Sequence, residues 1–175
     1  MSGGARHGNR QGKSMRIVGI CGSSRKGSNS EHLLRLALEP FRRKGAEVRM
    51  HRVGNLDMQP CLGCERCRTE GKCCIDDDIA SIYDDLYWTD AVIIAAPVYY
   101  RNIPSKPAAV FERAYAYRHD RPLEGKPGAA IAVGRGTGGG QRIVLSIIHD
   151  WLLSGGALSL GIDAVRRVTT LADRS

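Results

Sequence analysis

The sequence has little of what marks membrane-spanning, secreted or nucleic-acid-binding proteins. No apolar run approaches the ~18 residues of a transmembrane helix, and the N-terminus lacks the apolar middle of a secretion signal. Aromatic residues make up only 6% of the chain and are not interleaved with the basic residues that give its net charge of +8. We therefore expect a cytoplasmic protein with no membrane or nucleic-acid partner, and no disulfides among its six cysteines.

Two common phosphate-binding motifs are also missing. A Walker loop needs Gly-Lys followed by Ser or Thr, and Arg25-Lys26-Gly27 has a different order. The loop of a low-molecular-weight tyrosine phosphatase has the pattern C-x5-R. After Cys21, the position that this pattern requires to be arginine is Gly27. Both classes are therefore disfavoured.

Alternating strand and helix patterns predict the fold class. Apolar or alternating runs indicate strands at 16–21, 47–53, 91–96, 128–133 and 158–163, with helices at 31–44, 79–87, 106–117 and 141–153. Asp76, Asp77 and Asp78 stand where the second helix would start and are expected to cap it. Its apolar stripe is Ile79, Ile82, Tyr83, Leu86 and Tyr87. This order predicts an α/β protein with an open parallel sheet and helices on both faces.

The chain length suits one domain. The polar residues 1–14 are expected to form a disordered leader, and residues 15–175 form the domain, with a cysteine loop at 60–76 inserted after the second strand. Residues 164–175 hardly provide a final helix. We expect either a truncated C-terminal part or a sheet face that a partner subunit covers.

Three loops, 22–30, 97–105 and 134–141, follow the ends of predicted strands, where ligands of open sheets bind. The first is rich in Ser and Gly and precedes a helix, which indicates a phosphate cradle; alternatively, Ser28, Asn29 and Ser30 only cap the helix. The other two offer backbone amides and an aromatic wall. Together the three loops suit a ligand that carries a phosphate and a flat ring with polar edges. In an oxidoreductase, that ligand would be a flavin. Alternatively, the glycines of 134–140 only make the third loop flexible.

Five of the six cysteines lie within residues 61–74. Cys61, Cys64 and Cys67 have C-x2-C-x2-C spacing, and Gly63 and Gly71 allow tight turns between them. This spacing favours a [4Fe–4S] cluster over structural zinc or free thiols. We favour Cys73 over Cys74 as the fourth ligand because it gives the tighter loop.

These motifs together resemble the iron–sulfur flavoproteins, in the NADPH-dependent FMN reductase branch of flavodoxin-like proteins. The resemblance runs from about Arg16 to Ala157 and is carried by Gly22-Ser23-Ser24-Arg25, Ser28-Asn29, the cysteine motif with Pro60, Asp77-Asp78, Pro97-Val98-Tyr99, Lys106, Arg113, Gly125-Lys126-Pro127 and Gly138-Gly139-Gly140-Gln141. It implies a five-stranded flavodoxin-like sheet, FMN at its switch point, a [4Fe–4S] cluster on the cysteine loop and a homo-oligomer, a dimer or tetramer, that brings the two groups together.

The resemblance also implies which residues bind each group. The phosphate of FMN would be held by Ser23, Arg25, Ser28, Asn29 and Ser30. The flavin would be lined by Pro97, Val98, Tyr99, Tyr100, Asn102 and Ile103, with Gly134, Thr137, Gly138 and Gly139 on the other side. The cluster would be bound by Cys61, Cys64, Cys67 and Cys73, and Tyr99 and Arg101 are candidates for tuning the flavin.

We therefore expect an electron-transfer oxidoreductase that passes electrons between the cluster and FMN, from a ferredoxin-like donor or NAD(P)H to a small acceptor. A cluster-free NAD(P)H-dependent FMN or quinone reductase is the first alternative. A non-catalytic flavin- or zinc-containing sensor is the second.

Overall fold

A five-stranded parallel sheet forms the centre of the molecule, which we describe from a computed structural model for residues 14–135 and 139–160. The strand order is β2-β1-β3-β4-β5, and every neighbouring pair runs parallel. The strands are β1 (Arg16–Cys21), β2 (Glu47–Arg52), β3 (Ala91–Pro97), β4 (Pro127–Val133) and β5 (Leu158–Leu160). This order places β1, β3 and β4 side by side.

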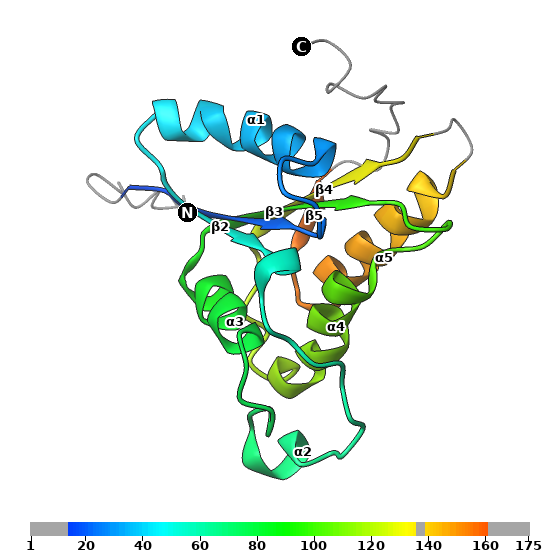
Figure 1. Ribbon diagram of the computed structural model, residues 1–175. Helices are drawn as coiled ribbons and strands as arrows, with labels where there is room; N and C mark the ends of the chain where they lie inside the picture. The colour runs from blue at the N-terminus through cyan, green and yellow to red at the C-terminus, as the bar shows by residue number, and fades with distance from the viewer. Residues whose placement is uncertain (1–13, 136–138, 161–175) are drawn as a thin grey trace, which may run out of the picture.

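Helices lie on both faces of the sheet (Figure 1). The helix α1 (Asn29–Arg43) covers one face; α3 (Ile79–Trp88), α4 (Ser105–Arg113) and α5 (Gln141–Ser154) cover the other. Short helical turns are η1 (Val53–Asn55), α2 (Cys67–Glu70) and η2 (Ala114–Tyr117). The segment around α2 projects below α3 and α4, away from the sheet (Figure 1).

Side chains of β1 alternate between two buried clusters because successive residues of a strand point to opposite faces. Ile17 and Cys21 pack under α1, whereas Val18 and Ile20 join the larger cluster beneath α3 to α5. A Cβ atom at Gly19 would lie 2.7 Å from Leu38 Cδ1. The glycine therefore lets α1 pack closely against the sheet.

The predicted open parallel sheet with helices on both faces is confirmed. The prediction that Tyr87 belongs to the apolar stripe of α3 was wrong. Its side chain is 42% exposed, because its hydroxyl extends to Asp120 Oδ2 at 2.7 Å. The predicted leader, except for Ser14, and residues 161–175, including the end of the last strand, lie outside the described residues. Within the described part, no helix is long and apolar enough to cross a membrane.

Candidate functional site

The three loops predicted to bind a ligand lie at one edge of the sheet. They follow β1, β3 and β4, which are consecutive neighbours. The backbone N–H of Gly22 donates to Ala95 O at 2.7 Å, and that of Val98 donates to Val133 O at 2.8 Å. These bonds tie the first loop to β3 and the second loop to β4. The described parts of the three loops therefore form one rim at the carboxyl ends of the strands.

The first loop presents hydroxyl groups in front of α1. Ser28 caps the helix, since its Oγ accepts a hydrogen bond from the Glu31 N–H at 3.2 Å, and Asn29 begins it. Ser23 is buried, and its Oγ accepts from the Arg25 N–H at 3.2 Å. The Ser30 hydroxyl is buried and has no hydrogen-bond partner among the described residues. A buried hydroxyl in that state is available to donate to a bound anion.

A carboxylate also faces this loop. Glu31 is 6% exposed, and its Oε2 accepts a hydrogen bond from the Gly27 N–H at 3.1 Å. Arg35 and Arg52 pair with the same carboxylate at 2.8 and 3.1 Å. Burial raises the pKa of Glu31, but the hydrogen bonds from Arg35 and Gly27 and the charge of Arg52 outweigh it, so the pKa lies below its ordinary value. The two guanidinium groups compensate the negative charge next to the cradle.

The second loop makes a tight hairpin. The backbones of Tyr99 and Asn102 exchange hydrogen bonds of 2.9 and 3.0 Å, and Tyr100 and Arg101 have φ angles of 43° and 66° between them. Tyr100 projects fully into solvent, whereas Tyr99 is 37% exposed. Pro97, Val98 and Ile103 are half-buried at the base of the hairpin, and Asn102 and Arg101 are exposed.

The third loop approaches the second. Gly140 has a φ of 95°, and a Cβ atom there would lie 2.7 Å from Arg101 Cα. A Cβ at Gly134 would lie 2.5 Å from Nε2 of the Gln141 side chain. Gly139 is half-buried, while the predicted residues Thr137 and Gly138 lie outside the described residues. Only glycine therefore fits where these two loops meet.

The cysteine loop encloses a pocket of its own. Gly63 and Gly71 have φ angles of 62° and 69°, as expected for the turns between the cysteines. All five loop cysteines line a pocket of about 240 Å³, together with Leu62, Ile75, Arg113 and Ala116. The pocket therefore brings the thiols together with apolar neighbours and with the charged residues Glu65, Glu112 and Arg113.

Within this pocket the thiols have different neighbours. The Sγ atoms of Cys64 and Cys74 are 3.4 Å apart. The Arg66 backbone N–H, and secondly the Cys74 thiol, hold the pKa of Cys64 below its ordinary value, while the hydrogen bond to Cys64 raises the pKa of Cys74. Among residues 14–135 and 139–160, no three Cys, His, Asp or Glu side chains are grouped as a metal site.

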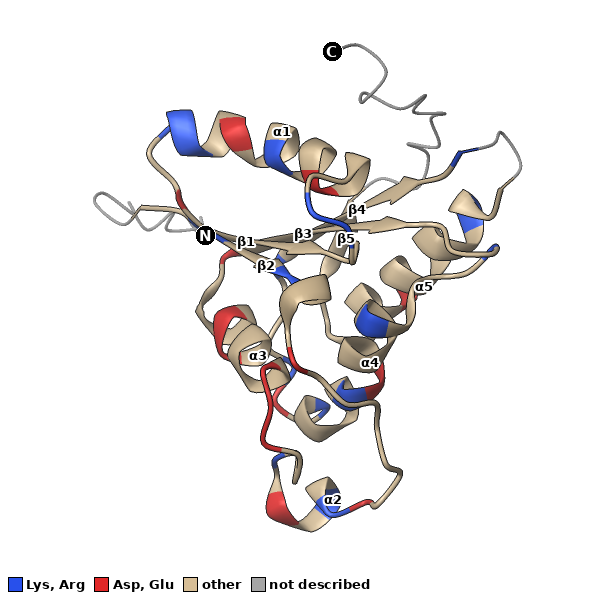
Figure 2. Cartoon of the chain, viewed as in Figure 1, with Lys and Arg blue, Asp and Glu red and all other residues tan. Residues whose placement is uncertain are grey.

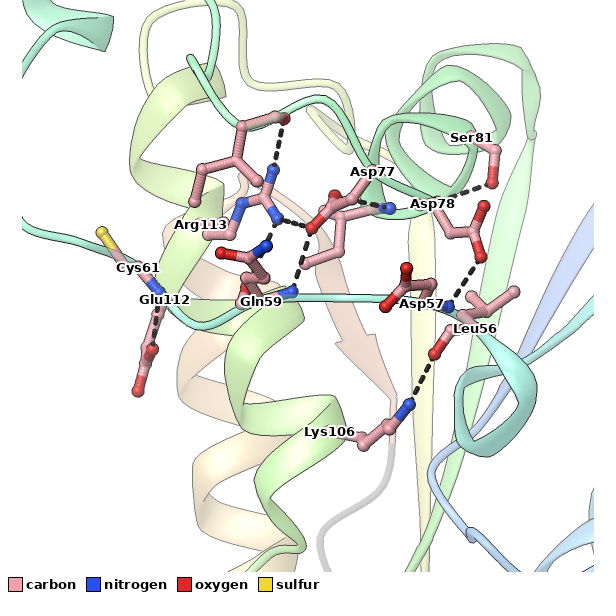
Figure 3. Close-up of polar contacts among 12 residues, drawn as sticks. Leu56, Asp57, Gln59, Cys61, Asp77, Asp78, Ser81, Lys106, Glu112 and Arg113 are labelled. Carbon is pink, nitrogen blue, oxygen red and sulfur yellow. Dashed lines mark hydrogen bonds and ion pairs between the residues drawn. The ribbon is translucent and has the colours of Figure 1, made fainter.

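Arg113 fastens both ends of the cysteine loop to the end of α4 (Figure 3). Its guanidinium donates to Gln59 O at 3.3 Å, before the cysteines, and to Ile75 O at 2.9 Å, after them. It also pairs with Asp77, whose Oδ2 accepts from the Gln59 N–H at 3.0 Å. Burial lowers the pKa of Arg113, but hydrogen bonds to Asp77 and the Cys73 sulfur outweigh it and raise the pKa above its ordinary value. Cys73 therefore lies beside this positive charge.

The acidic residues before α3 hold the loop as well as the helix. Figure 2 shows them along the segment that returns from α2 to α3. Asp77 Oδ1 accepts from the Ile79 N–H at 3.1 Å, which is a capping contact, but the Asp78 side chain caps nothing and instead accepts from the Asp57 N–H at 2.7 Å. From α4, the Glu112 carboxylate also holds the loop, because it accepts from the Cys61 N–H at 3.3 Å. The acidic segment before α3 was predicted only to cap the helix, and it also anchors the cysteine loop.

A five-stranded parallel sheet in this strand order, with helices on both faces, defines a flavodoxin-like protein. Residues 15–164 match the NADPH-dependent FMN reductase family, and the chain belongs to this family, in its iron–sulfur flavoprotein branch. It is 39% identical over 148 residues to an iron–sulfur flavoprotein of Methanosarcina thermophila, covering 84% of this chain and 78% of that protein. It is 33% identical over 139 residues to one of Methanocaldococcus jannaschii, covering 79% and 72%.

Solved structures share the fold. An NAD(P)H:quinone oxidoreductase from Methanothermobacter marburgensis superposes with a TM-score of 0.69 at 17% identity, covering 86% of this chain and 83% of that one. The flavoenzyme FerB, an NAD(P)H:acceptor oxidoreductase from Paracoccus denitrificans, gives 0.67 at 18% identity, with 91% and 81% covered. Together with the family membership, these findings identify a flavin-dependent oxidoreductase.

Proposed function

We propose that this protein transfers electrons between a [4Fe–4S] cluster on the cysteine loop and FMN at the three-loop rim. When bound, FMN exchanges one or two electrons and a cluster exchanges one at a time, so the pair connects one-electron donors with two-electron acceptors. The observation that carries the proposal is the single pocket lined by five cysteines on a protein of the FMN reductase family.

The cysteine pocket suits an iron–sulfur cluster in its chemistry. Thiolates are the ligands of such clusters, and Cys61, Cys64, Cys67 and Cys73 are the four we assign. Leu62, Ile75 and Ala116 supply apolar surroundings. Arg113 fixes both ends of the loop and places a positive charge beside Cys73. The thiols are not grouped as a metal site among the described residues, so the loop must tighten to bind iron.

The first loop suits the phosphate of FMN. Donors are provided by the hydroxyls of Ser23, Ser28 and Ser30, the last of which is buried with no partner in the described part of the chain. The start of α1 adds a positive helix end. Arg25 is exposed at the mouth of the loop and can pair with the phosphate. The half-buried base of the second loop, at Val98 and Ile103, then offers apolar contact to a ring.

The two proposed binding regions lie at opposite ends of α4. The helix begins at Ser105, directly after the second loop, and ends at Arg113, which lines the cysteine pocket. Eight residue steps of an α-helix separate these ends by about 12 Å. A second copy of the chain that places its rim against the cysteine pocket would shorten this path, which favours the homo-oligomer. We further propose that this protein acts in the cytoplasm. Its electron donor would be a ferredoxin-like protein or NAD(P)H.

A cluster-free NAD(P)H-dependent FMN or quinone reductase is the second candidate. It is favoured by the absence of a metal-like grouping among the described residues and by the redox enzymes that share the fold.

The two candidates differ in how the flavin is reduced. We expect a reduced ferredoxin-type donor to reduce the flavin of the anaerobic wild-type protein, and Cys67→Ala to slow this at least about tenfold while retaining FMN. NADPH reduction at equal rates in both proteins, with no effect of the substitution on ferredoxin-driven reduction, would instead support the cluster-free reductase. Stopped-flow absorbance of the flavin measures both.

A further inference from the structure

One pair of cysteines stands apart from the others in the pocket. Cys64 and Cys74 are ten positions apart in the chain, and their Sγ atoms lie 3.4 Å apart. It is the one thiol pair in hydrogen-bonding contact among the described residues. The adjacent Cys73 lies near Arg113 instead, so the two neighbouring cysteines have different surroundings.

The pair is placed to form a covalent bond. A disulfide needs sulfurs about 2 Å apart, so the two Sγ atoms must approach each other by about 1.4 Å. Cys64 is exposed and Cys74 is half-buried on a loop that projects from the domain, so a small oxidant can reach them and no core side chain must move.

We propose that Cys64 and Cys74 form a reversible disulfide in the cluster-free protein, and that this bond blocks iron binding until it is reduced. This rests on the proposed function, because the loop must be a cluster loop for the second half to hold. Four cysteine thiolates are needed for a [4Fe–4S] cluster. The disulfide removes Cys64 from the assigned set and leaves Cys61, Cys67 and Cys73, which cannot complete it.

The oxidant we name is a small-molecule disulfide such as oxidised glutathione. The Cys64 thiolate attacks one of its sulfurs and expels one thiolate, which forms a mixed disulfide. The Cys74 thiolate then attacks Cys64 Sγ and expels the second. Two cysteine thiols have lost two electrons and two protons, and the small disulfide has become two thiols. Reduction by a dithiol reverses both steps.

The test uses the full chain after anaerobic removal of iron, reduction and desalting, followed by treatment with oxidised glutathione. We expect a mass loss of about 2 Da, corresponding to two hydrogen atoms. Titratable thiols should fall from six to four. Uptake of iron and sulfide should fall at least tenfold relative to the reduced protein and should return after dithiothreitol treatment.

Matched variants assign the bond. Cys64→Ser and Cys74→Ser should lose the mass change, whereas Cys61→Ser and Cys73→Ser should keep it, with circular dichroism showing that all four fold. The proposal would be overturned if Cys74→Ser lost 2 Da at the wild-type rate, because a disulfide would then form without Cys74. A stable glutathione adduct on the wild-type protein would also overturn it. If the reduced wild type binds no iron but still closes this bond, the disulfide is established, whereas the cluster function and the block on iron binding both fail.

Discussion

Replacing Arg113 tests whether one buried ion pair holds the cysteine loop on the domain. Arg113→Met keeps an apolar stem on α4 but removes the guanidinium that pairs with the Asp77 carboxylate and donates to the carbonyls of Gln59 and Ile75. The two side chains of the pair are 2% and 7% exposed. Removing one partner of a buried pair costs about 3–5 kcal/mol. We expect about 3 kcal/mol, since the released loop ends can be hydrated.

Urea unfolding of the apoprotein measures this loss. With an m value of about 2 kcal/mol/M, the midpoint should fall by about 1.5 M. The control is Arg43→Met, whose pair with Glu39 is 77% and 44% exposed and should matter by less than about 0.5 kcal/mol. In the double variant with Asp77→Asn, the losses should not add, with a coupling of at least about 1 kcal/mol. An Arg113→Met midpoint equal to that of the control would refute the role of Arg113 in holding the cysteine loop on the domain.

Three further substitutions test the rim at the carboxyl ends of the strands. Gly140→Ala should lower stability by about 1–3 kcal/mol, because the residue has a φ of 95° and its Cβ would lie 2.7 Å from Arg101 Cα; an unchanged thermal midpoint would contradict the close approach. Ser30→Ala should leave apoprotein stability within about 0.5 kcal/mol, because its hydroxyl has no partner among the described residues, but should raise the Kd for FMN about tenfold in a fluorescence titration. Glu31 has a folded pKa below its unfolded value of 4.5, so the stability it contributes is complete above that pH and is lost as the pH falls through the folded pKa. Glu31→Gln should therefore lose stability less steeply than wild type below pH 4.5 in acid unfolding, and an identical slope would argue against the role of this carboxylate.

The parts of the molecule that follow from local pattern could be predicted. The apolar run Ala91–Ala96 forms a buried strand because both its faces are covered, and Ser28 caps α1 because a hydroxyl at that position reaches the free N–H groups of the first turn. The turn glycines of the cysteine loop have the left-handed backbone that their spacing required. The five cysteines share one pocket because they are close in sequence.

Contacts between distant segments could not be predicted in the same way. Arg113 and Asp77 are 36 residues apart, and nothing in either segment alone shows that they pair. A usable signal was an arginine three positions after Val110 on the buried face of α4, which requires a buried partner. Tyr87 was placed in the core because it continues the helical stripe, but its polar end draws it to the surface.

The most direct test of the cluster and flavin pairing is an anaerobic visible spectrum of freshly purified protein, with FMN, iron and acid-labile sulfide determined per chain. We predict flavin bands on a broad absorbance near about 400 nm, with one FMN and about four irons and four sulfides per chain. Stoichiometric FMN without iron or sulfide in protein never exposed to air would contradict the account and leave a cluster-free flavin reductase.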